Sequence, residues 1–198
     1  AIITGASEGI GAAFSKLLIK KGWKVFGISR SSSKLKAMSK SFKSKEQSFK
    51  YFSCDVQDFK KLKSIAKEIE APDLLFLNAG IYSPVKASEI NLDLYKKHIN
   101  INYLGVLNCY EAFLPSLIRK QNGHIIIMSS VSGWIGLPKA AAYGPTKAAL
   151  RSFAQSARYD LNPKGIKVQL CSPGFVETQA TSINDFYMPG LMLSLIHI

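Results

Sequence analysis

Residues 4–11 read T-G-A-S-E-G-I-G and lie between an apolar segment at the start of the chain and a helical pattern that begins near Ala12. A glycine-rich turn between a strand and a helix is typical of sites that bind phosphate at a helix N-terminus. Gly5 permits a tight turn, Gly9 lets the backbone approach a pyrophosphate, and Gly11 allows helix and strand to pack closely. On its own the motif also fits an ordinary strand-to-helix turn.

Short β-rich segments alternate with longer helical patterns along the chain. Strands are expected at residues 1–3, 24–29, 49–53, 74–77, 124–129 and 167–170, and helices near residues 12–20, 34–42, 60–69, 101–119 and 148–161. The apolar run I-I-I-M at residues 125–128 indicates a strand buried on both faces, as in a parallel sheet covered by helices. The predicted fold class is therefore α/β, a doubly wound parallel sheet in a single domain.

The composition favours a compact domain in a reducing compartment. The 198 residues are 47% hydrophobic, which suffices for one core. The three cysteines, Cys54, Cys109 and Cys171, have no C-x-x-C spacing and lie in or beside apolar runs. No apolar run approaches the roughly 20 residues of a membrane-spanning helix. We therefore expect a cytoplasmic protein that does not bind membranes.

The formal net charge of +13 leaves nucleic acid or an acidic membrane surface open as partners. Much of this charge lies in the Ser- and Lys-rich residues 34–50, which also fit the solvated face of a helix and its loop. The basic residues do not form a known nucleic-acid-binding motif. We therefore expect a small-molecule substrate and no nucleic-acid partner.

Both ends of the sequence suggest a truncated reading frame. We expect residues 1–192 to be a fragment of one domain whose last strand is missing. Residues 193–198, L-S-L-I-H-I, match the translation of a sequencing-library transposon end, so we expect a non-native tail there. Residues 180–190 are expected to form part of a lid over the substrate.

The strongest chemical signal is Tyr143 and Lys147, which are four residues apart and share one face if the segment is helical. A phenol with a pKa of about 10 is a poor acid or base at neutral pH unless a nearby cation stabilises its phenolate, and Lys147 is placed to be that cation. Ser130, at the end of a buried strand, is placed to bind a substrate oxygen. The pair alone also fits a half-buried helix face. Pro145 is tolerated if the helix begins near residues 142–144.

The glycine spacing T-G-x-x-x-G-x-G, the N-A-G at residues 78–80, Ser130 and the Y-x-x-x-K at residues 143–147 occur in one order. This order resembles the short-chain dehydrogenase/reductase family, which has the Rossmann fold. The resemblance implies an enzyme that transfers a hydride between a nicotinamide cofactor and a carbonyl or alcohol. It also makes Asn102 a fourth catalytic residue that holds a water beside Lys147, with Asn100 as its rival.

The second strand ends at Arg30-Ser31, where this fold places the adenosine ribose. An arginine can hold a 2′-phosphate, and no acid is present to bind a free 2′-hydroxyl, so NADP is favoured over NAD. An exposed arginine that starts a basic helix is the alternative. Glu8 departs from NADP-preferring relatives, many of which have a basic residue there. The resemblance implies that Asp55 binds the adenine, although it also fits a helix or turn cap.

The resemblance further implies that the loop at residues 173–178 contacts the nicotinamide. The predicted catalytic residues are Asn102, Ser130, Tyr143 and Lys147, and no metal site is predicted. The predicted cofactor-binding residues are Thr4, Gly5, Ser7, Gly9, Ile10, Gly11, Arg30, Ser31, Asp55, Val56, Asn78, Ala79, Gly80, Tyr143, Lys147, Pro173, Gly174, Val176 and Thr178. A non-catalytic dinucleotide-binding protein of the same fold is the alternative function. We expect the full-length protein to be a homo-oligomer that reduces carbonyl compounds.

Overall fold

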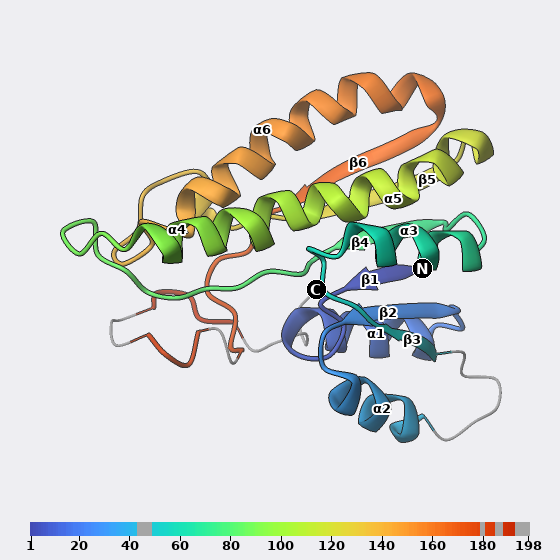
Figure 1. Cartoon of the computed structure of the whole chain (residues 1–198), viewed down its shortest axis with the longest axis horizontal. Coiled ribbons are helices and arrows are strands. Elements are labelled where there is room, and N and C mark those ends of the chain that lie inside the picture. Colours follow the sequence, from blue (N-terminus) through green and yellow to red (C-terminus); the bar gives the residue numbers. More distant parts are fainter. Residues whose placement is uncertain (43–48, 179–180, 185–187, 193–198) are drawn as a thin grey trace.

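The computed structural model describes residues 1–42, 49–178, 181–184 and 188–192. Its centre is a parallel sheet with the strand order β3-β2-β1-β4-β5-β6 (Figure 1). The strands are β1 (Ile2–Thr4), β2 (Val25–Ser29), β3 (Phe49–Ser53), β4 (Leu74–Leu77), β5 (Gly123–Met128) and β6 (Ile166–Cys171). All six lie within one or two residues of the predicted segments, and the doubly wound α/β fold is confirmed.

Helices connect the strands in the way the periodicity predicts, with one exception. The α-helices are α1 (Gly9–Lys20), α2 (Ser32–Ser41), α3 (Phe59–Glu68), α4 (Leu92–His98), α5 (Gly105–Lys120) and α6 (Gly144–Leu161). Between α4 and α5, Ile99–Leu104 form a π-helix, so helical structure begins at Leu92 and not near residue 101. The sequence pattern hides this extension because Leu92 and Ile99 are apolar but exposed.

Two hydrophobic cores cover the two faces of the sheet. The larger one packs α3, α5 and α6 on the sheet through side chains such as Leu62, Phe113 and Leu150. The smaller one packs α1 and α2 on the opposite face through Leu18 and Leu35. This arrangement explains the apolar run in β5, because alternate residues of a parallel strand face helices on each side.

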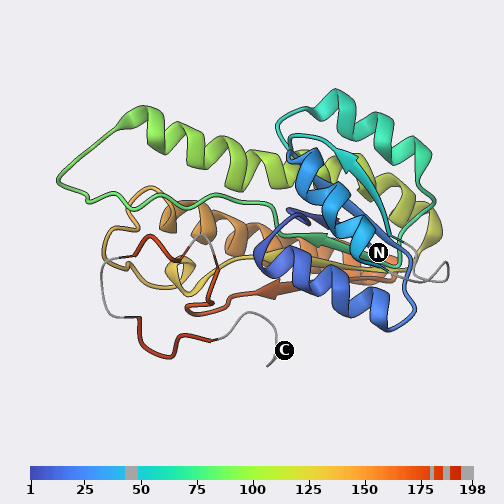
Figure 2. The same cartoon turned by 90° about the horizontal axis from the view of Figure 1, so that it is seen from below.

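The strand order reverses direction at β1, which pairs with β2 on one side and β4 on the other. Open α/β sheets bind ligands outside the carboxyl ends of the strands at such a switch point. Figure 2 shows the segments that follow β4, β5 and β6 extending from this same end of the sheet. The topology therefore places the candidate site at the carboxyl ends of the strands next to β1.

Two predictions fall partly or wholly outside the described residues. Of the predicted substrate lid at residues 180–190, residues 180 and 185–187 are outside them, and the lid stays a prediction. Residues 193–198, the predicted non-native tail, lie outside the described residues, and the domain boundary at residue 192 stays a prediction. Within the described part of the chain, no helix combines the length and hydrophobicity needed to cross a membrane.

Candidate active site

A pocket of about 420 Å³ lies at the carboxyl ends of the strands. It is lined by residues from the segments that follow all six strands, from Gly5 after β1 to Asn184 beyond β6. We call it the strand-end pocket. A single pocket thus contacts both halves of the sheet, as a ligand with two separate ends requires.

The glycine turn forms one side of the strand-end pocket. Gly5 has a positive φ of 66°, which glycine adopts without steric cost. A Cβ atom at Gly11 would lie 2.2 Å from the carbonyl oxygen of Gly5, so only glycine fits this contact between helix and strand. Glu8 precedes α1 without capping it through its side chain, which leaves first-turn amides available to an anion. The turn has the geometry that the sequence predicts for a phosphate site.

Thr4 and Asn78 hold the glycine turn against the neighbouring strand. The hydroxyl of Thr4 accepts hydrogen bonds from the backbone N–H groups of Asn78 and Ala79, both at 3.0 Å. The side-chain amide of Asn78 donates to the carbonyl oxygen of Thr4 at 3.1 Å. Thr4 is buried, so its role here is to tie β1 to β4.

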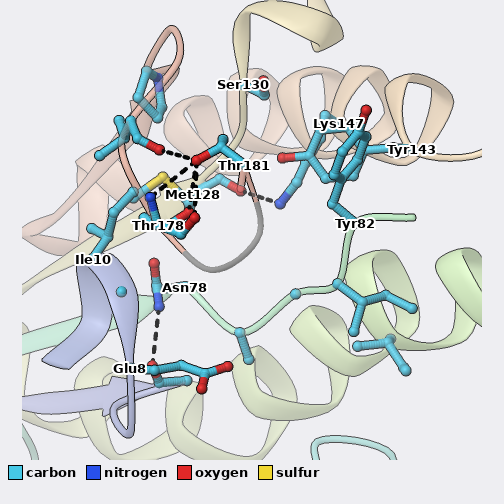
Figure 3. A pocket seen from close by; sticks show the side chains of 18 of the residues that line it. Glu8, Ile10, Asn78, Tyr82, Met128, Ser130, Tyr143, Lys147, Thr178 and Thr181 are labelled. Atoms are coloured by element: carbon cyan, nitrogen blue, oxygen red, sulfur yellow. Dashed lines mark hydrogen bonds between the residues drawn. The ribbon is translucent and has the colours of Figure 1, made fainter. Parts of the chain in front are cut away.

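Ser130, Tyr143 and Lys147 lie together on the other side of the strand-end pocket (Figure 3). Tyr143 immediately precedes α6, and Pro145 occupies the first turn of that helix, where no amide is needed. The Lys147 Nζ is 5.5 Å from the centre of the Tyr143 ring and donates to the carbonyl oxygen of Met128 at 2.9 Å. The two side chains share one face of the helix, as their spacing predicts.

Burial changes the acidity of both groups. It raises the pKa of Tyr143 to about 12, and a hydrogen bond with Ser130 only partly opposes this shift. It lowers the pKa of Lys147 to about 8, because the ammonium lies in a dry environment. The expectation that Lys147 eases the ionisation of Tyr143 stays a prediction, and the net pKa shift of the phenol is upward. The physical reason is that desolvation of the phenol dominates, while the ammonium is directed at Met128.

Asn102 is fully buried in the middle of the π-helix. Its side chain accepts from the N–H of Ile81 at 2.7 Å and donates to the carbonyl oxygen of Ile81 at 2.9 Å. It also donates to the hydroxyl of Thr146 at 3.3 Å, next to Lys147 on α6. Its rival Asn100 is exposed. The structure therefore brings Asn102, and not Asn100, to the active-site helix.

A family model of short chain dehydrogenases matches residues 1–185. The chain belongs to this family. The short-chain dehydrogenase fold explains why a glycine turn and a Tyr-Lys pair that are far apart in the sequence share one pocket. The chain is accordingly a dinucleotide-dependent oxidoreductase that acts on a small molecule.

Individual relatives agree with this assignment. An uncharacterized oxidoreductase of Myxococcus xanthus is 31% identical over 97% of this chain and 78% of its own length. A serine 3-dehydrogenase of Agrobacterium fabrum is 33% identical over 92% of this chain and 74% of its own length. A solved structure described as ElxO with NADP bound is 28% identical, with a TM-score of 0.86 over 98% of this chain and 86% of that one.

Most predicted site residues of this short-chain dehydrogenase line the strand-end pocket. The lining includes Gly5, Ser7, Gly9, Ile10, Arg30, Asp55, Val56, Asn78, Ala79, Gly80, Ser130, Tyr143, Lys147, Pro173, Gly174, Val176 and Thr178. Four predicted residues do not line it: Thr4, Gly11, Ser31 and Asn102. Ser31 caps α2 by accepting from the N–H of Lys34, which accounts for its hydroxyl. Asp55 fits both readings of the sequence, because it lines the pocket and also accepts from the N–H of Gln57.

Two functional features are not predicted from the sequence, and a third lies within the predicted lid at residues 180–190. The Lys34 side chain forms an ion pair with Glu8, so a basic group from α2 reaches the glycine turn. Tyr82 lines the strand-end pocket, and its ring meets that of Tyr143 edge-on, with centroids 5.2 Å apart. Thr181 lines the pocket as well. Of Lys34 and Tyr82, Tyr82 carries a signal in the sequence, since it closely follows the N-A-G segment at the end of a strand.

The network around Asn102 predicts a specific loss of stability. In Asn102→Ala, both backbone groups of Ile81 lose their partner inside the protein, which costs about 2 kcal/mol in the free energy of unfolding. Urea denaturation measures this difference. Asn100→Ala is the matched control and should stay within about 0.5 kcal/mol, because the side chain is exposed. Equal effects of the two substitutions would contradict the assignment.

Proposed function

We propose that this enzyme reduces a carbonyl compound with NADPH, using Ser130, Tyr143 and Lys147 as catalytic residues. The observation that carries the proposal is the shared pocket, in which a phenol beside a serine and a lysine faces the same space as an uncapped helix N-terminus. The CH–OH/C=O chemistry has further support from the relative named serine 3-dehydrogenase, whose name specifies an alcohol or its ketone.

Each catalytic side chain has a role that follows from its position. A bound reduced nicotinamide supplies the hydride. Tyr143 donates a proton to the carbonyl oxygen, and Ser130, which is hydrogen-bonded to it, holds that oxygen. Lys147 contributes positive charge to the nicotinamide side of the pocket. It also helps to return a proton to Tyr143 after each reaction. Asn102 acts through the loop at Ile81 and through Thr146, so we assign it a positioning role.

The protonated state of Tyr143 supports the reductive direction. With a pKa raised to about 12, the phenol keeps its proton at neutral pH. Carbonyl reduction needs a proton donor, whereas alcohol oxidation needs a base. Burial thus favours the form of Tyr143 that reduction uses.

Basic groups support NADP as the cofactor. Arg30 lines the pocket just after β2, where the fold places the adenosine ribose. Glu8 lies nearby and would repel a phosphate, but Lys34 forms an ion pair with it and offsets its charge. The structure described as ElxO with NADP bound shares the fold at 28% identity. With the charge of Glu8 offset in this way, Arg30 provides the positive charge that a 2′-phosphate requires.

The Arg30 assignment predicts a change in cofactor choice. In Arg30→Ala, the Kd for NADPH should rise about 10- to 100-fold, because one or two charge-assisted hydrogen bonds contribute a binding free energy of that size. The Kd for NADH should change less than about threefold, because NADH has no 2′-phosphate. Fluorescence titration of both cofactors measures the ratio. Lys36 is an exposed charge on α2, so Lys36→Ala controls for the general loss of positive charge. A parallel loss for NADPH and NADH would refute the role.

The direct test of the proposed function is NADPH consumption in the presence of uncharged aldehydes and ketones. We expect oxidation of NADPH that depends on the carbonyl compound. If NADPH binds but no carbonyl compound is reduced, the alternative of a non-catalytic dinucleotide-binding protein replaces the proposal. The predictions of a cytoplasmic location, of no nucleic-acid or membrane partner and of a homo-oligomer stay predictions.

A further inference from the structure

Among the described residues that line the strand-end pocket, the charged side chains occupy one half, apart from the active-site lysine. Of the described residues that line it, the charged ones are Glu8, Arg30, Asp55 and Lys147. Glu8, Arg30 and Asp55 follow β1, β2 and β3, which form one half of the sheet. Ser130 and Tyr143 follow β5 on the other half. The charges therefore lie toward the adenosine side, away from the place where the carbonyl reacts.

Apolar groups form the wall next to the catalytic tyrosine. The ring of Tyr82 packs edge-on against that of Tyr143, with an interplanar angle of 78°. Leu137 and Pro138 line the pocket from the turn that leads into α6. This turn is fixed by backbone hydrogen bonds, from Ala140 to Leu137 at 3.2 Å and from Gly144 to Ala140 at 2.7 Å. The wall is thus built from two apolar side chains and an aromatic ring.

Three polar side chains near this wall are engaged inside the protein. The hydroxyl of Tyr82 donates to Oδ1 of Asn184 at 3.0 Å, which joins the loop after β4 to the segment after β6. The amide of Asn184 donates in turn to the sulfur of Met188 at 3.3 Å. The hydroxyl of Thr181 donates to the carbonyl oxygen of Val176 at 2.6 Å. A substrate would have to break these bonds to use the same groups.

We infer that the substrate is an uncharged carbonyl compound with an apolar or aromatic group next to the reacting carbon. The inference rests on the proposed function and names the substrate class of the same site. A charged substituent in this half of the pocket would lose its hydration. Among the described lining residues of this half the one charged group is Lys147, whose ammonium already donates to the carbonyl oxygen of Met128. An apolar substituent would instead pack on Tyr82, Leu137 and Pro138. Serine, which carries both an ammonium and a carboxylate, does not fit this wall, although a relative is named for it.

The test compares charged aldehydes with neutral ones of the same shape. One pair is 4-carboxybenzaldehyde and its methyl ester, and the other is 4-(trimethylammonio)benzaldehyde and 4-tert-butylbenzaldehyde. The full chain is assayed with saturating NADPH, and kcat/KM is measured for each compound. We expect the kcat/KM of the neutral member of each pair to be at least about tenfold higher than that of the charged member. Serine should give no reduction of NADP⁺. Equal or higher kcat/KM for a charged member would overturn the inference.

Substitutions in the wall test where the selectivity arises. Tyr82→Ala should raise KM for 4-tert-butylbenzaldehyde about tenfold and leave the Kd for NADPH unchanged, whereas Tyr82→Phe keeps the ring and should keep the ranking. Leu137→Lys should raise kcat/KM for the carboxylate relative to its ester by about threefold. Ile135→Lys is the matched control, because Ile135 is exposed and does not line the strand-end pocket. An equal effect of both lysines would place the selectivity elsewhere and overturn the assignment of the wall.

The outcomes separate this inference from the proposed function. If neutral and charged aldehydes are all reduced without preference, the reaction stands and the inference fails. If NADPH binds but no aldehyde is reduced, the proposed function fails and the inference falls with it. The cofactor titration, which needs no substrate, distinguishes the second case from loss of folding.

Discussion

Replacing Tyr143 with phenylalanine should lower kcat for carbonyl reduction about 10³-fold, within the range by which a general acid accelerates a reaction. The substitution removes the hydroxyl that donates the proton but keeps the ring that packs on Tyr82. The Kd for NADPH should change less than about threefold, because Lys147 and the glycine turn remain. The loss should appear equally in kcat and kcat/KM, since the hydroxyl acts mainly in the transition state. Steady-state kinetics and fluorescence titration measure the two quantities.

Tyr159 provides a matched control for this substitution. It lies on the same helix, α6, and is 81% exposed. Tyr159→Phe removes the same hydroxyl from the same element and should leave kcat within about twofold. A Tyr143→Phe enzyme that retains more than a tenth of the activity would show that another group, such as water, protonates the substrate.

The fold can be predicted from the sequence because each strand, turn and helix is marked by residues within its own short segment. Buried parallel strands read as apolar runs, as residues 125–128 do, and each lies between turn residues and a helical pattern. The glycine turn also follows from local geometry, since Gly5 and Gly11 lie where no side chain fits. The helical extension at Leu92 could not be read in this way, because Leu92 and Ile99 face solvent and obscure the amphipathic pattern.

The site is predictable only where a motif marks it. Ser130, Tyr143 and Lys147 are found from spacing and chemistry, and Asn102 from the family resemblance. The pairing of Lys34 with Glu8 depends on how α2 lies against the glycine turn, and spacing contains no such information. The direction of the Tyr143 pKa shift is missed for a related reason. Charge proximity can be read from spacing on a helix, but desolvation depends on the whole surrounding fold.

Gly11 is the position where a single added side chain should damage the protein most. A Cβ atom there would lie 2.2 Å from the carbonyl oxygen of Gly5 and 2.7 Å from the Asn78 side-chain amide. Both neighbours belong to the network that joins β1 to β4, so neither can move without breaking other bonds. We expect Gly11→Val to lower the free energy of unfolding by about 4 kcal/mol, above the usual range for overpacking, because the clash is with backbone.

The same substitution should abolish NADPH binding, because the glycine turn has to shift away from the helix N-terminus that would receive the phosphates. Urea denaturation measures the stability loss, and fluorescence titration at a temperature where the variant is folded measures binding separately. Gly136→Val is the matched control, since a Cβ atom there meets nothing within 4 Å and the stability should change by less than about 1 kcal/mol. A Gly11→Val protein that is destabilised but still binds NADPH normally would show that the close contact serves folding alone. The phosphate site would then have to lie elsewhere in the strand-end pocket.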